Sequence, residues 1–259
     1  MLVCIWMWKD NYMNQFLSSK ILKQISREQL LGKYKTVILA YLLAYIFSYM
    51  VRYFATPTGT TSILGMLVPI AITLIGTLID GIFTFGQCHL YLRIARENQC
   101  SLEDVIYGFK NFPDKAIGIQ FVLTASELVC AIPLMVFYTL FVTTKNSVYA
   151  IPLVLSFLVY AILTIAIRLL FSQAFYLLND HPDWKFMELL KESTRMMKGH
   201  KFRLFCIHIS FLGLLFLGLL SIGIGMFWVS CYRNMVCANF YENLIGNLKD
   251  ESVSIDITV

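Results

Sequence analysis

The sequence is poor in charge. Only 14% of its 259 residues are Asp, Glu, Lys or Arg, whereas 58% are hydrophobic, and the mean hydropathy is +0.68. A typical soluble domain carries about 25% charged residues, so this composition excludes an ordinary soluble protein and leaves no stretch for a separate soluble domain. The chain is long enough for about six spans of roughly 20 residues, each able to cross a hydrocarbon core about 30 Å thick.

Paired cysteines and metal-ligand motifs are also missing. The seven cysteines contain no CxxC pair, and most lie in apolar stretches, at positions 4, 88, 100, 130, 206, 231 and 237. We interpret them as free thiols that behave as small apolar side chains. The histidines, at positions 89, 181, 200 and 208, show no HExxH or other ligand spacing. No metal site and no cofactor are therefore expected.

Catalytic motifs are absent as well. The chain has no G-x-S-x-G elbow, P-loop or dinucleotide fingerprint, so the sequence favours a protein that is not an enzyme. The net charge of +5 does not indicate nucleic-acid binding, because the positive-inside rule explains basic clusters beside spans. The first 13 residues lack the basic region and cleavage site of a secretory signal, and Met13 is an alternative start.

Long apolar runs separated by turn residues predict the membrane spans. Six are expected, at approximately 35–54, 63–92, 116–142, 148–178, 202–220 and 224–245. We therefore expect an all-α, polytopic transmembrane helical bundle. Its expected divisions are a cytoplasmic N-terminal amphipathic arm (1–34), a six-span membrane domain (35–246) and a polar C-terminal tail (247–259).

Amphipathic segments lie between and before these spans. Residues 14–31 alternate apolar and basic side chains, which indicates a helix on the inner leaflet or, alternatively, a solvated helical leader. The segments 101–112 and 179–199 predict two cytoplasmic interfacial helices, the first opening with the capping pattern from Ser101 to Asp104. The apolar side chains of that first helix share one stripe: Leu102, Val105, Ile106 and Phe109.

Basic residues are distributed unevenly between the two sides of this topology. Apart from Arg168 and Arg233, which lie inside spans, only Arg52 and Lys145 fall opposite the side that holds both termini and the two interfacial helices. Because basic connections remain in the cytoplasm, both termini should be cytoplasmic.

Two similar stretches suggest an internal repeat. FGQCHLYL and FSQAFYLL match at three positions each, namely Phe85, Gln87 and Leu92 against Phe171, Gln173 and Leu178. Each repeat would contain a span, a surface helix and a returning span, which gives a parallel two-fold repeat about an axis along the membrane normal. Chance similarity within an apolar chain is the alternative.

The C-terminal half also resembles a known family. The segment NDHPDWKFMELLKESTRMMKGHKFRLF and the run SFLGLLFLGLLSIGIGMFWVSCYRNMVCANFYENL are similar to bacterial integral membrane proteins with domain of unknown function 975. The matching positions are Asp180, Pro182, Ser193, Met197, Lys198, Gly199, His200, Phe205, Ser210, Phe211, Gly218, Gly223, Gly225, Trp228, Tyr232, Phe240 and Tyr241. Cys231 stands where proline is expected.

The resemblance implies an all-helical, multi-pass protein of the bacterial cytoplasmic membrane. It extends more loosely to the membrane domain that is sometimes fused to glycerophosphodiester phosphodiesterases. It implies no established activity, and it supplies no catalytic residues.

Ionisable residues inside spans are costly and are therefore candidates for function. Counting along each span places Glu127 and Arg233 near the midplane, and Asp80 and Arg168 near the inner surface. We predict the pairs Glu127–Arg233 and Asp80–Arg168. A polar cavity or proton path is one interpretation. Charge pairs that hold the helices in register are favoured, because one acid for each base leaves no charge for a substrate.

The basic cluster before the fifth span supplies candidate contacts to lipid headgroups. Its members are Lys198, His200, Lys201 and Arg203. Cations near an anionic leaflet each contribute about 1 kcal/mol, although the same cluster also serves to determine topology. The leading hypothesis is a non-enzymatic protein that interacts with the bilayer, anionic lipids, a membrane-protein partner or a second copy. The alternative is a small transporter or lipid translocator that uses the midplane charges.

Overall fold

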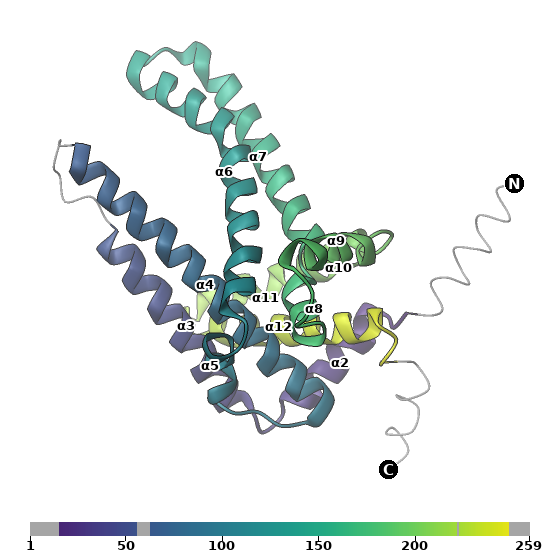
Figure 1. The fold of residues 1–259 in the computed structure, drawn as a ribbon. Helices are drawn as coiled ribbons and strands as arrows, with labels where there is room; N and C mark the ends of the chain where they lie inside the picture. The colour runs from purple at the N-terminus through teal and green to yellow at the C-terminus, as the bar shows by residue number, and fades with distance from the viewer. Residues whose placement is uncertain (1–15, 56–62, 222, 249–259) are drawn as a thin grey trace, which may run out of the picture. The chain divides into compact units, whose positions relative to one another are not determined.

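The computed structural model describes residues 16–55, 63–221 and 223–248, which are helical with no strand. Figure 1 shows the helices α2 (Ser19–Leu30), α3 (Tyr34–Phe54), α4 (Ile63–Glu97), α5 (Glu103–Lys110), α6 (Pro113–Thr144), η1 (Ser147–Tyr149), α7 (Ala150–Leu170), α8 (Ala174–Asp180), α9 (Phe186–Met196), α10 (Lys201–Ser210), α11 (Leu212–Leu220) and α12 (Ile224–Leu244). The start at Met13 and most of the expected tail lie outside the described residues.

Two compact units make up the chain. The first unit contains the residues up to 47, residues 83–110 and the residues from 202 onward. The second unit contains residues 48–82 and 111–201, so α3 and α4 each contribute to both.

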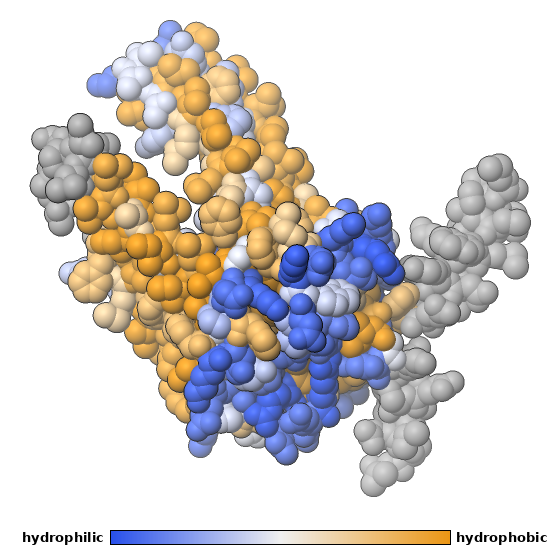
Figure 2. All heavy atoms as spheres, in the orientation of Figure 1, coloured by the Kyte–Doolittle hydropathy of each residue, from blue (hydrophilic) through white to orange (hydrophobic). Residues whose placement is uncertain are grey.

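Five segments among the described residues are long and apolar enough to cross a membrane. They are Tyr34–Phe54, Leu67–Glu97, Pro113–Thr144, Ala150–Asp180 and Lys201–Leu220. These segments correspond to the first five expected spans. In Figure 2 the surface over α3, α4, α6 and α7 is mostly apolar, which is what lipid-facing helices require. The helix α12 stands at the place of the sixth expected span, but it is not among the five.

The helix ends have local causes in the sequence. Pro113 lies in the first turn of α6, where its missing N–H costs no hydrogen bond. Gly32 separates α2 from α3 with a φ of +79°, a conformation that glycine adopts without steric cost. Two expected spans are interrupted rather than continuous, since α7 ends before Phe171 and α10 ends before Phe211.

Glycines make the turn between α11 and α12. Gly223 has a φ of +81° and precedes α12. A Cβ atom added to Gly225 would lie 2.9 Å from the Cα of Gly218 and 2.5 Å from the Oγ of Ser221. The two helices therefore approach at a distance that only glycine permits.

The first unit is built around α12. The fully buried side chains of this helix include Cys231, Met235, Val236, Ala238 and Phe240. Its polar side chains, including the buried Asn239, Glu242 and Asn243, explain why its hydropathy falls below that of the five candidate spans. The sixth expected span is thus a helix whose C-terminal half is enclosed by protein.

The N-terminal amphipathic helix packs on α12. The buried face of α2 carries Leu22, Ser26 and Leu30, and the amide nitrogen of Asn239 donates to the Oγ of Ser26 at 2.8 Å. The hydroxyl of Tyr232 donates to the carbonyl of Lys23 at 3.0 Å. The apolar stripe of α2 was expected to face the inner leaflet, and instead it contributes to the core of the first unit.

The second unit contains the long α6–α7 hairpin and the helices α8 and α9. The helix α9 was expected to lie at the membrane interface, and its apolar side chains Leu189 and Leu190 are buried within the unit. A Cβ atom added to Gly118 of α6 would lie 2.9 Å from the ring of Phe186, so α6 and α9 pack closely. The hydroxyl of Ser193 donates to the carbonyl of Leu170 at 2.9 Å and so ties α9 to the end of α7.

Candidate functional site

The α6–α7 hairpin carries an ion pair within its membrane segments. The Nε of Arg168 lies 2.9 Å from Oε1 of Glu127. The glutamate side chain is 24% exposed and the arginine side chain is 69% exposed. An arginine exposed in hydrocarbon is costly, so its carboxylate partner offsets part of that cost.

This pairing differs from the predicted one. Glu127 was expected to pair with Arg233 and Asp80 with Arg168, whereas Glu127 pairs with Arg168. Arg233 lies on α12 in the first unit, where its charge acts on His208. The structure therefore brings together one acid and one base of the four, in a combination that the depth count did not give.

Asp80 has a hydroxyl partner on α3. The Oγ of Ser48 donates to Oδ1 of Asp80 at 2.6 Å. A Cβ atom added to Gly76 would lie 2.1 Å from Cγ1 of Val51, so α3 and α4 are in close contact one turn away. The two helices are thus held together by packing and by a partly buried hydrogen bond.

The four candidate headgroup contacts divide into two groups. Lys198 and Lys201 are exposed, and a positive φ of +87° at Gly199 turns the chain between them. His200 is buried. Of these three side chains, the two lysines are open to contact with a phosphate.

Arg203 is a structural residue of the first unit. Its Nη2 donates to the carbonyl of Leu17 at 2.5 Å and to Oδ1 of Asn243 at 2.7 Å. The guanidinium also lies 5.5 Å from the ring centre of Phe16 and 4.9 Å from that of Phe240. The Nη2 of Arg203 is thus bonded to the entry to α2 and to α12, and its Nη1 is buried without a hydrogen-bond partner among the described residues. We therefore expect Arg203 to hold the fold rather than to contact a headgroup.

A second arginine in the first unit holds a carboxylate that the sequence did not single out. Arg96, at the end of α4, lies 2.7 Å from Oε1 of the buried Glu242 through its Nη2. Asn247 donates to the other oxygen of this carboxylate at 2.8 Å. Glu242 stands near the end of an apolar run, where it reads as a boundary residue. In the structure Glu242 is buried together with its neighbours Tyr241 and Asn243, so the protein encloses the end of α12.

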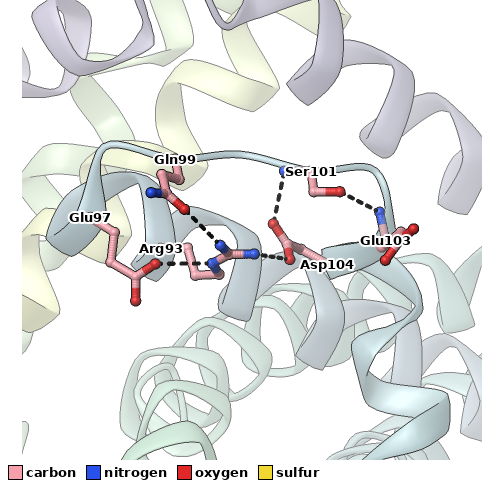
Figure 3. Close-up of polar contacts among 6 residues, drawn as sticks. All are labelled: Arg93, Glu97, Gln99, Ser101, Glu103 and Asp104. Atoms are coloured by element: carbon pink, nitrogen blue, oxygen red, sulfur yellow. Dashed lines mark hydrogen bonds and ion pairs between the residues drawn. The ribbon is translucent and has the colours of Figure 1, made fainter.

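A polar network fixes α5 to the end of α4 (Figure 3). Arg93 donates to Asp104 at 2.6 Å, to Gln99 at 3.1 Å and to Glu97 at 3.3 Å. Asp104 also accepts from the backbone N–H of Ser101 at 2.9 Å, as the capping pattern predicts. The apolar side chains of α5 then divide: Val105 is buried, whereas Leu102, Ile106 and Phe109 are 42%, 43% and 41% exposed.

The start of α3 has a perturbed lysine. Partial burial lowers the pKa of Lys33, whose ammonium donates to the side-chain oxygen of Asn98. This contact ties the turn before α3 to the residue that follows α4.

No reactive constellation is assembled in the described part of the chain. Its residues contain no group of three His, Cys, Asp or Glu side chains able to hold a metal. The expected free thiols are found at all six described cysteines, at positions 88, 100, 130, 206, 231 and 237. The arrangement supplies exposed lysines, exposed apolar faces and the intramembrane pair of Glu127 and Arg168.

Comparison with known proteins identifies a family and no activity. A family model described as protein of unknown function (DUF975) matches residues 13–248. The resemblance inferred from the C-terminal half is confirmed, and it extends through both units. No curated protein and no solved structure matches the chain.

Proposed function

We propose a function for this chain, which belongs to the DUF975 family of proteins of unknown function. It is a non-enzymatic, multi-pass protein of the bacterial cytoplasmic membrane that binds anionic lipid on its basic face. This face consists of Lys198, Lys201 and the exposed cations of α9. The observation that carries this proposal is the exposed lysine pair Lys198 and Lys201 beside a helix with a buried apolar face. An integral membrane protein with several apolar helices is the established part. Lipid recognition is the inference.

The helix α9 supports a headgroup-binding surface. Its exposed cations continue the lysine pair and include Lys185, Lys191 and Arg195. Met187 on the same helix is 59% exposed, so an apolar side chain is available to enter the acyl boundary. The affinity of an interfacial helix for the membrane increases with the apolar area that it buries and with its attraction to anionic lipid.

The helix α5 is a second candidate for a helix at the membrane interface, and it carries fewer cations than α9. Leu102, Ile106 and Phe109 project from it, while the network around Arg93 holds its other face. Amphipathic helices with such an apolar edge lie in the interface plane. The proposal therefore has two interfacial helices on one side of the membrane, and a membrane-protein partner or second copy remains compatible with the exposed α6–α7 surface.

Contacts within the first unit support an even number of crossings. The helix α2 precedes the first candidate span, and it packs against the C-terminal half of α12 through Ser26 and Asn239. This packing favours an arrangement in which both ends of the described chain share one side of the membrane. The surplus of basic residues favours the cytoplasm as that side.

The proposed parallel repeat relates the two interfacial helices. FGQCHLYL ends before α5, and FSQAFYLL ends before α9. Of the three matched pairs, Leu92 and Leu178 are buried in both stretches. The looser resemblance to the membrane domain fused to glycerophosphodiester phosphodiesterases stays a prediction from the sequence.

Lipid enrichment tests the proposal. The purified protein is assembled into nanodiscs from equimolar phosphatidylglycerol and phosphatidylcholine, and the lipid ratio in the isolated discs is compared with that of empty discs. We expect an excess of phosphatidylglycerol that falls in the double variant Lys198→Gln, Lys201→Gln. The matched control is Lys145→Gln, an exposed lysine at the opposite end of α6. Discs with the same ratio as empty ones would contradict lipid recognition.

A transporter or lipid translocator is the second candidate. The 69% exposed side chain of Arg168 within a candidate span favours it, because such a cation suits a hydrated path. Liposomes that contain labelled phosphatidylglycerol in the inner leaflet test translocation. Transfer that is lost in Arg168→Gln would support this candidate, and transfer equal to that of protein-free liposomes would exclude lipid translocation.

A further inference from the structure

A groove of about 710 Å³ opens beside the first turns of α3 in the first unit. Its volume lies within the range of roughly 300–1,000 Å³ that is typical of sites for small molecules. One wall is formed by α3, from Tyr34 to Leu42, and Trp228 of α12 faces it. The groove therefore starts where the first candidate span begins and continues along it.

The deeper part of the groove is apolar. Ile38, Leu39 and Leu42 line it at helical spacing, and Leu39 is 51% exposed. The distance along the helix axis from Lys35 to Leu42 is about 10 Å at 1.5 Å per residue. Because these residues belong to a candidate membrane span, the medium beside them is hydrocarbon rather than water.

Two aromatic side chains frame the entrance. The rings of Tyr34 and Trp228 lie 5.5 Å apart between centroids, with an interplanar angle of 46°. Trp228 is 50% exposed. Tyrosine and tryptophan are enriched at membrane interfaces, where their rings meet headgroups and acyl chains. The aromatic pair therefore marks the depth of the headgroup region.

The entrance is positively charged. Lys35 lines it and is exposed, and the charge of the exposed Arg27 acts on the phenol oxygens of Tyr34 and Tyr232. The first turn of α3 adds backbone N–H groups, which have no acceptor within the helix and favour an anion. Gly32 leaves the space beside the turn open, since an added Cβ would meet no atom within 4 Å.

We propose that an anionic phospholipid occupies this groove, with its phosphate at Lys35 and the first turn of α3 and one acyl chain along Ile38, Leu39 and Leu42. The inference rests on the proposed function and assigns it a second, separate site. A soluble peptide would not reach the apolar part, which lies along a candidate span. The groove has a cationic end, an aromatic rim and an apolar wall, which match the phosphate, the interface region and the acyl chain of one anionic phospholipid.

Fluorescence quenching of Trp228 tests the site. The native chain and Trp228→Phe are placed in phosphatidylcholine nanodiscs that contain either brominated phosphatidylglycerol or brominated phosphatidylcholine. The difference between the two chains isolates the signal of Trp228. We expect half-maximal quenching at about a fivefold lower mole fraction of the anionic lipid, which corresponds to about 1 kcal/mol for one cation at the surface.

Matched lysine variants separate this site from the basic face. Lys35→Gln should remove the preference of Trp228 for the anionic lipid, whereas Lys20→Gln, exposed on α2 and outside the groove, should retain it. Equal quenching by both lipids in the native chain, or an unchanged preference in Lys35→Gln, would overturn the assignment. If nanodiscs retain excess phosphatidylglycerol in that case, the groove fails and the proposed function stands. If they do not, both fail.

Discussion

Replacement of Arg203 by methionine should destabilise the protein strongly without affecting its lipid preference. The guanidinium makes two charge-assisted hydrogen bonds, to Leu17 and Asn243. At about 1.5 kcal/mol each, the low end of the range because the residue is half-buried, they contribute about 3 kcal/mol. The two aromatic contacts add about 0.5 kcal/mol each, and the cost of desolvating the cation opposes them. The expected net loss is about 3 kcal/mol.

Equilibrium unfolding in mixed detergent micelles, followed by circular dichroism, measures this loss. Lys201→Met provides the control on the same helix, since an exposed side chain there should change stability by no more than about 0.5 kcal/mol. The order of the two variants should reverse in the lipid-enrichment assay. There Lys201→Met should lower the excess of phosphatidylglycerol, and Arg203→Met should leave it unchanged. A stability of Arg203→Met within about 0.5 kcal/mol of the native value would refute the structural role.

Three further predictions concern the helix contacts. Glu127→Gln and Arg168→Gln should each lower the unfolding midpoint more than the exchanged pair Glu127→Arg, Arg168→Glu, with a coupling of about 0.5–3 kcal/mol; additive effects would refute the pairing. Gly225→Ala should cost about 1–3 kcal/mol because its Cβ would crowd Gly218, whereas Gly213→Ala, with open space around it, should be neutral or stabilising; equal midpoints would contradict the close approach. Asn239→Ala should expose α2 to added protease before the rest of the chain, and an unchanged cleavage pattern would show that α2 is held without it.

Much of the helical framework could be predicted because apolar length determines a span. The first five expected spans correspond to helices whose ends differ by a few residues, as at Pro113, where proline marks the start of α6. The breaks at Phe171 and Phe211 were missed because both lie within continuous apolar runs, and only contacts made after folding reveal them. The contact of Ser193 with Leu170 is one of these.

The charge pairing was missed because depth was counted from the wrong reference. The helix α6 has 32 residues and exceeds the hydrocarbon core, so its first residue does not mark the membrane edge. Counted from the shared hairpin turn, Glu127 lies about 17 residues before the end of α6 and Arg168 about 18 residues after the start of α7. In an antiparallel hairpin these positions are level, and the pair follows.

The basic cluster shows that a sequence pattern does not distinguish exposed cations from cations bound within the fold. Lys198, Lys201 and Arg203 look alike as cations before an apolar run, yet two are exposed and one is held by Leu17 and Asn243. The difference arises from contacts between residues far apart in the chain. Such contacts give no periodic pattern in the neighbouring sequence. The same reason explains why the pair of Arg96 and Glu242 was missed.

Side-specific labelling of single cysteines tests the central claim that the basic face and both chain ends share the cytoplasmic side. In a chain with its native cysteines replaced, Lys20→Cys, Lys198→Cys and Asn247→Cys are treated with an impermeant thiol reagent, beside Lys145→Cys. We expect the first three to react only from the cytoplasmic side and the fourth only from the opposite side. Reaction of position 198 from the same side as position 145 would contradict the account.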